Sequence, residues 1–177
     1  MPVREVRARA VILTVSGAKA SGVVLSEPDF DKRGACRGYV SDTFGVAKTP
    51  KQREAWATEA WELAQALDLP LVVVFSEDPF SYGLSSTSWL TALRRVGINI
   101  RMSWLREKPQ TWQAKVFGKP RSRTLKGLKV SAVRYAEEKL KMGPDLQENI
   151  AEAACIRVWA ERAPEVHALL TRQKKAA

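Results

Sequence analysis

Residues 69–80, LPLVVVFSEDPF, decide the fold of this chain. The run 71–75 is apolar throughout and rich in β-branched residues, which is typical of a central strand covered on both faces. A helix is predicted just before it, over about residues 49–67, with Thr49 as N-cap and Pro50 in the first turn. The central strand then ends in a polar turn that begins at Ser76.

The elements predicted on either side of this strand give the fold class. Residues 10–15 and 21–25 read as a strand hairpin, and residues 35–41 as a third strand. After the central strand we expect a helix from Ser85 to Val96, a short strand over 98–102, an ordered segment over 112–117 of strand or loop type, and helices over 124–141 and 145–162. The order predicts a mixed α/β sheet, with three antiparallel strands followed by parallel ones and helices on both faces.

Length and composition indicate one globular domain. The chain has 177 residues with 45% hydrophobic and 27% charged residues, which excludes a disordered or fibrous protein. We predict a domain over residues 1–165 and a basic C-terminal tail over 166–177, whose last residues, TRQKKAA, are frayed. No apolar run is long enough to cross a bilayer, and the N-terminal apolar stretch reads as a strand instead of a signal peptide. Two cysteines favour a reduced, cytoplasmic setting.

The positive charge is concentrated in one stretch. The chain has a net charge of +10, and residues 101–141 hold twelve Lys and Arg against three Glu. Trp104, Trp112, Phe117 and Tyr135 are interleaved there. Cations neutralise phosphates and flat rings can stack on unpaired bases, so the stretch favours a nucleic-acid surface over a merely solvated face. A membrane-surface helix is disfavoured by its Gly and Pro content.

Two acidic groups are candidates for chemistry. Glu77 and Asp78 follow the central strand, and sites in open α/β sheets gather at the carboxyl ends of strands. Glu148, Asn149 and Glu152 share one side of the last predicted helix. The alternatives are a helix-cap or turn acid at Glu77 and a solvated helix face for Glu148 and Glu152. No P-loop, G-x-G-x-x-G or G-x-S-x-G motif is present, so neither a nucleotide cofactor nor a serine triad is supported.

The pattern resembles the RuvC family of Holliday-junction resolvases, in the ribonuclease H-like superfamily. The resemblance runs over about residues 11–163 and rests on four segments: ILTVSGAKASGVVL, LPLVVVFSEDPF, WQAKVFG with the basic loop and helix after it, and ENIAEAACIRVWA. It implies a ribonuclease H-like fold and a homodimer that cuts four-way DNA junctions with Mg²⁺ or Mn²⁺ held by four acids. Such a protein would act in DNA recombination and repair.

Carried to this sequence, the resemblance places Glu77 at the central-strand acid and Glu152 at the last helix acid. Asn149 falls where the other helix acid is expected, with Glu148 or Asp78 as substitutes, and Ser16 stands in place of the first-strand acid. The metal site is therefore degenerate.

The resemblance also bears on DNA contacts. It offers Lys115, Lys126 and Lys129 as contacts to DNA phosphates, and the basic loop adds Lys119, Arg121 and Arg123.

Two functions remain open from the sequence. One is a structure-specific DNA-binding protein that cleaves branched DNA with Mg²⁺ or Mn²⁺ if its site is intact. The other is a catalytically inactive RuvC-like module that binds DNA or supports assembly without a cofactor. A structural protein that ignores DNA is a third class, which the concentrated charge disfavours.

Overall fold

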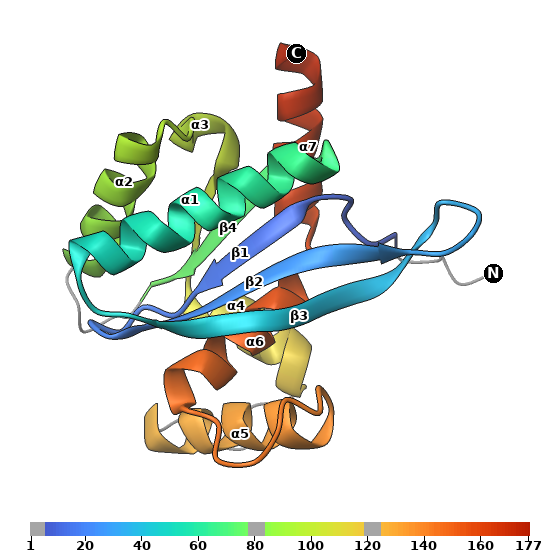
Figure 1. The fold of residues 1–177 in the computed structure, drawn as a ribbon. Helices are drawn as coiled ribbons and strands as arrows, with labels where there is room; N and C mark the ends of the chain where they lie inside the picture. The colour runs from blue at the N-terminus through green and yellow to red at the C-terminus, as the bar shows by residue number, and fades with distance from the viewer. Residues whose placement is uncertain (1–5, 78–83, 119–124) are drawn as a thin grey trace.

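The computed structural model describes residues 6–77, 84–118 and 125–177, and shows a mixed sheet between two layers of helices (Figure 1). Among these residues the sheet has five strands in the order β3-β2-β1-β4-β5. The β1–β2 and β2–β3 pairs are antiparallel, while β1–β4 and β4–β5 are parallel. The predicted ribonuclease H-like mixed sheet is thereby confirmed.

The elements follow one another in an order close to the predicted one. They are β1 (Val11–Val15), β2 (Ser21–Phe30), β3 (Cys36–Ala47), α1 (Pro50–Leu67), β4 (Leu71–Ser76), α2 (Leu84–Val96), α3 (Ile100–Ser103), β5 (Trp104–Glu107), α4 (Pro109–Phe117), α5 (Leu125–Glu138), α6 (Glu148–Ala160) and α7 (Pro164–Ala176).

The central strands β1 and β4 are buried on both faces. Every residue of each strand is buried, and their parallel register pairs Val11 with Leu71 and Val15 with Phe75. Side chains alternate between the faces. Val11, Leu13, Val73 and Phe75 join the core under α1 and α2, whereas Ile12, Val72 and Val74 join the core under α4, α5 and α6. This explains why both strands read as continuous apolar runs.

Helix α1 begins and ends where its sequence predicts. Thr49 forms a capping box with Gln52, in which each side chain accepts a hydrogen bond from the backbone N–H of the other, and Pro50 opens the first turn. Asp68 ends the helix in the left-handed conformation at φ 52°. The buried residues Ala57, Ala60 and Ala64 allow α1 to lie close on the sheet.

Some of the predicted elements were wrong. The strand predicted over 98–102 is replaced by the short helix α3, and the strand itself, β5, comes directly after it. The ordered segment 112–117 lies within helix α4. The frayed end predicted over 171–177 lies mostly in helix α7, which begins at Pro164 and buries Val166 and Leu169. Strand β2 continues to Phe30 and β3 to Ala47, so the first hairpins are longer than predicted.

Candidate functional site

Two serines lie side by side at the carboxyl ends of the central strands. The β1–β4 register pairs Val15 with Phe75, and the next residues are Ser16, directly after β1, and Ser76, the last residue of β4. Both are buried, at 0% and 1% exposure. By alternation they share the sheet face of Thr14 and Val74, which is covered by α4 and α6.

Both serine hydroxyls are engaged by donors of the protein itself. The backbone N–H of Gly22 donates to Ser16 Oγ at 2.8 Å, and Trp112 Nε1 donates to Ser76 Oγ at 2.9 Å. All of these atoms are buried. The hydroxyls therefore satisfy two donors that would otherwise be buried without a partner.

The first turn of α6 closes over the same corner. Asn149 Nδ2 donates to the carbonyl oxygen of Ala20 at 2.8 Å, while Asn149 Oδ1 is buried without a hydrogen-bond partner. A Cβ placed on Gly22 would lie 2.0 Å from the carbonyl carbon and oxygen of Asn149. One turn further along, Thr14 Oγ1 donates to the carbonyl oxygen of Ala153 at 2.8 Å. Helix α6 thus rests directly on β1 and β2.

The two acids of α6 have different surroundings. Glu148 is exposed and its carboxylate lies 3.7 Å from Lys129 Nζ on α5, which pairs a predicted site acid with a predicted phosphate contact. Glu152 is half-buried, three residues after Asn149. Burial, and then the Glu152 carboxylate, raise the pKa of the Cys155 thiol. A buried thiol of this kind packs in the core.

Glu77 lies at the end of β4 but toward the opposite face. Its Oε2 is 3.7 Å from Arg106 Nε, and Arg106 is in register with Phe75, which belongs to the core under α1 and α2. The structure therefore brings Ser16, Ser76 and Asn149 to one corner and separates Glu77 from them. The other predicted acid here, Asp78, lies outside the described residues.

Comparison with solved structures relates this arrangement to known proteins. Thermus thermophilus RuvC superimposes with a TM-score of 0.56 at 15% identity, covering 93% of this chain and 96% of RuvC. RuvC of T. thermophilus in complex with a Holliday junction substrate gives a TM-score of 0.54 at 14% identity, covering 92% and 96%. The fold is RuvC-like. The yeast mitochondrial Holliday junction resolvase Ydc2 matches at a TM-score of 0.45 and 12% identity, covering 94% and 87%.

Comparisons at the sequence level found no relatives. No family model and no curated protein matches the chain. At identities of 14–15% the likeness to RuvC shows the fold alone.

The corner of the RuvC-like fold that holds the serines does not fit a pair of divalent cations. Mg²⁺ and Mn²⁺ pairs are bound mainly by clustered carboxylates. Here the strand ends supply two neutral hydroxyls that already accept hydrogen bonds, and α6 supplies the amide of Asn149. Within the described ranges, no three His, Cys, Asp or Glu side chains are grouped closely enough to hold a metal ion.

Ser76 is the member of this corner that sequence reasoning missed. The sequence analysis chose the neighbouring Glu77 as the site residue of the central strand because Glu77 is charged. The period of two along β4 was the available signal, since Ser76 is in phase with Val72 and Val74 and Glu77 is out of phase with them.

The predicted basic segment is divided between the two layers of the RuvC-like fold. Arg101 and Arg106 lie on α3 and β5, whereas Lys115 lies on α4 and Lys126 and Lys129 on α5. Lys115 is exposed, and so are Arg134, Lys139 and Lys141 in and after α5. The side chain of Lys126 is not described, and Lys119, Arg121 and Arg123 lie outside the described residues.

The aromatic side chains of this segment pack in or against the two cores of the protein. Trp112 and Phe117 are 5.9 Å apart and Phe117 and Tyr135 are 6.0 Å apart, each pair in an edge-to-face arrangement. Trp104 stacks on Phe75 at 5.4 Å. The prediction that these rings stack on bases is therefore not supported, and the cations remain as the candidate nucleic-acid interface.

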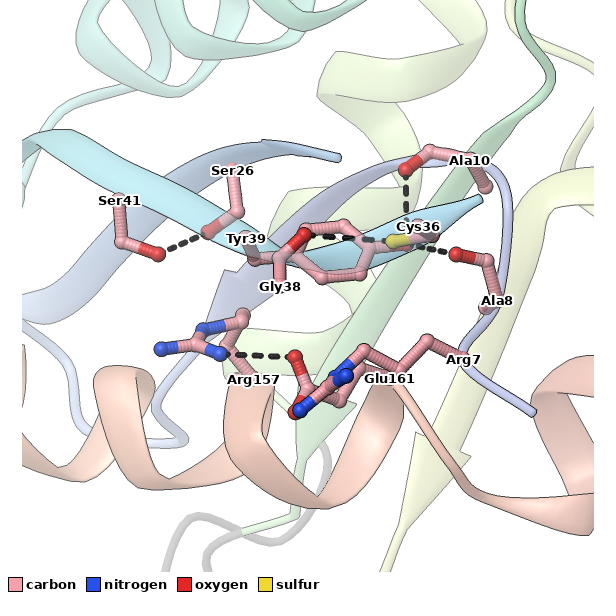
Figure 2. Close-up of polar contacts among 10 residues, drawn as sticks. All are labelled: Arg7, Ala8, Ala10, Ser26, Cys36, Gly38, Tyr39, Ser41, Arg157 and Glu161. Carbon is pink, nitrogen blue, oxygen red and sulfur yellow. Dashed lines mark hydrogen bonds and ion pairs between the residues drawn. The ribbon is translucent and has the colours of Figure 1, made fainter. Parts of the chain in front are cut away.

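A buried polar cluster at the far end of α6 was also missed by sequence reasoning (Figure 2). Arg157 Nη1 donates to Glu161 Oε2 at 3.0 Å, and both side chains are less than 10% exposed. The Tyr39 hydroxyl donates to the carbonyl oxygens of Ala8 and Ala10. Burial raises the pKa of Tyr39, so its phenol stays neutral. The cluster joins β3, the start of β1 and the end of α6.

The helices in the described ranges include none with the length and apolar composition that a membrane span requires.

Proposed function

We propose that this protein binds branched DNA through its RuvC-like fold and does not cut it. The observation that carries the proposal is a RuvC-like fold over 93% of the chain, with exposed cations on α4, on α5 and just after α5. We call this part of the surface the α4–α5 layer. One of the RuvC structures with this fold is a complex with a Holliday junction substrate. The net charge of +10 agrees with a polyanionic partner.

The cations on the α4–α5 layer support phosphate binding. Lys115, Arg134, Lys139 and Lys141 are exposed, and α4, α5 and α6 cover the same face of the sheet (Figure 1). Each cation that neutralises a phosphate releases a counterion, so binding through this layer must weaken steeply as salt is added. The undescribed Lys119, Arg121 and Arg123 connect α4 to α5 in sequence and stay predicted contacts.

The residues of the serine corner, Ser16, Ser76 and Asn149, favour DNA binding without cleavage over DNA hydrolysis. Metal-dependent cleavage needs several carboxylates around two cations. Ser16 and Ser76 are neutral, buried and hydrogen-bonded, and Glu77 pairs with Arg106 toward the other face. Cleavage with Mg²⁺ or Mn²⁺ is therefore the outcome that we expect not to observe.

A homodimer would suit a junction, because two copies of the α4–α5 layer could hold two pairs of arms. This is a proposal from the resemblance to RuvC. The mass of the free protein and of its junction complex, measured by light scattering, tests it directly.

The binding experiment compares two charge reversals. Arg134→Glu changes an exposed cation of α5, and Arg94→Glu makes the same change on α2, which covers the opposite face of the sheet. Fluorescence anisotropy with a labelled four-way junction and a duplex of equal length, both in EDTA and over a salt series, gives Kd and the salt slope. We expect Arg134→Glu to weaken junction binding about tenfold and to lower the slope by about 1, with little change for Arg94→Glu.

Three results would contradict the proposal. They are no binding of any DNA at low salt, equal affinity for duplex and junction, and nicked junction products in Mn²⁺ that disappear in a Glu152→Gln variant. Equal losses of junction affinity in Arg134→Glu and Arg94→Glu would show that the DNA interface does not lie on the α4–α5 layer.

A further inference from the structure

We propose that Ser16, Ser76 and Asn149 form a metal-independent hydrogen-bonded corner that positions α4 and α6 on the sheet, where a cation site would otherwise stand. The inference deepens the proposed function, because it explains why DNA would be bound and not cut. It does not depend on DNA binding, so the two can fail separately.

Three elements distant in sequence supply the corner. Ser16 and Ser76 follow the last register pair of β1 and β4, and Asn149 stands in the first turn of α6. Ser16 is bonded to Gly22, and Gly22 lies against the backbone of Asn149, so strand and helix meet at this point. The corner is thus an assembly contact of the fold.

The serines are suited to the donors they meet. The Gly22 N–H and Trp112 Nε1–H are buried and point at Ser16 Oγ and Ser76 Oγ. A neutral hydroxyl accepts such a bond without the cost of burying a charge, whereas carboxylates packed together at 0–1% exposure would repel one another unless a cation joined them. The present residues therefore need no cation.

The backbone contact of α6 reinforces this interpretation. The approach of α6 to β2 leaves no space for even one carbon atom on Gly22. The Asn149 side chain is tied to the Ala20 carbonyl oxygen, and Thr14 bonds the next turn of α6 through Ala153. Helix α6 is held by direct protein contacts at three consecutive places.

The first experiment measures thermal unfolding in EDTA and in millimolar Mn²⁺. We expect the wild-type Tm to be the same in both. The triple variant Ser16→Asp, Ser76→Glu, Asn149→Asp should melt lower in EDTA and gain about 5–10 °C in Mn²⁺, because the ion then binds the folded state alone. A wild-type Tm that rises in Mn²⁺, and no longer rises after Glu152→Gln, would overturn the proposal.

The second experiment tests the hydrogen bonds without any metal. In EDTA, Ser16→Ala and Ser76→Ala should each lower the Tm by about 3–6 °C, because each leaves a buried donor unpaired. Ser131→Ala is the matched control, since that hydroxyl donates to the Gly127 carbonyl oxygen of its own helix, and it should shift the Tm little. Ser16→Ala and Ser76→Ala proteins as stable as wild type would refute the corner. This arm decides the matter even if the triple variant does not fold.

Junction binding in EDTA separates the two proposals. A wild-type protein that is insensitive to Mn²⁺ but ignores DNA would support the corner and contradict the proposed function.

Discussion

Replacing Gly22 with alanine tests how tightly α6 is seated on the sheet. The added methyl carbon would lie 2.0 Å from the carbonyl carbon and oxygen of Asn149 and 2.3 Å from the backbone nitrogen of Ile150. These are backbone atoms, so no side-chain rotation can relieve the overlap. Since ordinary contact begins at about 3.4 Å, the first turn of α6 would have to retreat by roughly 1.4 Å.

That retreat would disturb a large apolar contact. Helix α6 buries Ile150, Ala151, Ala153 and Ala154 at 0–8% exposure, and Val24 of β2 lies in the same cluster as three of them. Overpacking of a dense core costs about 1–3 kcal/mol, and we expect the upper end because rigid backbone is displaced. A loss of about 3 kcal/mol corresponds to a fall in Tm of roughly 6–12 °C for a chain of this size.

Thermal and urea unfolding, followed by far-UV circular dichroism, measure this loss. Gly38→Ala is the matched control, because Gly38 lies in the neighbouring strand β3 and a Cβ there meets nothing within 4 Å. We expect Gly38→Ala to be neutral or slightly stabilising. If Gly22→Ala melted as Gly38→Ala does, the close seating of α6 on β2 would be refuted.

Three further predictions concern charged and polar groups around α6. Glu161→Ala should cost about 3–5 kcal/mol in urea unfolding, because the buried Arg157 loses its partner, whereas Ala at the exposed Glu165 should cost little. Glu148→Gln should change stability by less than about 0.5 kcal/mol, because its ion pair with Lys129 is exposed; a larger change would show a structural role. Burial raises the pKa of Tyr39 above its ordinary value of 10.0. The contribution of the neutral phenol to the free energy of unfolding is therefore complete below pH 10 and is lost as the pH rises through the folded-state pKa. The decline of unfolding free energy above pH 10 should therefore be shallower in Tyr39→Phe, and an unchanged decline would contradict it.

The central sheet could be predicted because its strands have clear local sequence patterns. The runs of β1 and β4 are apolar on both faces, and α1 carries its own capping signals at Thr49 and Pro50. Local chemistry fixes these elements, so their prediction needs no knowledge of the packing.

The elements that were misjudged carry competing local signals. Residues 98–102 alternate apolar and polar residues as a strand does, but the Asn99 side chain accepts a hydrogen bond from the backbone N–H of Arg101 and caps the short helix α3. The basic residues at the end of the chain suggested a solvated tail. The three-residue spacing of Val166 and Leu169, which are buried in α7 after Pro164, instead indicates a helix with one apolar face. Charge at the end of a helix is compatible with a buried stripe in its first turns.

The candidate site was predicted only in part, for a geometric reason. Ser16 and Asn149 were recognised through the resemblance, and the structure brings both to one corner. Ser76 was passed over for Glu77, although a shift of one residue along a strand moves a side chain to the other face. Trp112 donates a hydrogen bond to Ser76 from α4. The two residues are far apart in sequence, so their contact could be known only from the folded structure.

The late position of α6 in the chain has a consequence for synthesis on the ribosome. The β1–β4 sheet is complete in sequence at Ser76, but the face that carries Ile12, Val72 and Val74 is covered mainly by residues of α6, which starts at Glu148. At common translation rates, roughly 4–14 s separate the two events. During that interval the nascent residues that will form this apolar face have no α6 to cover them.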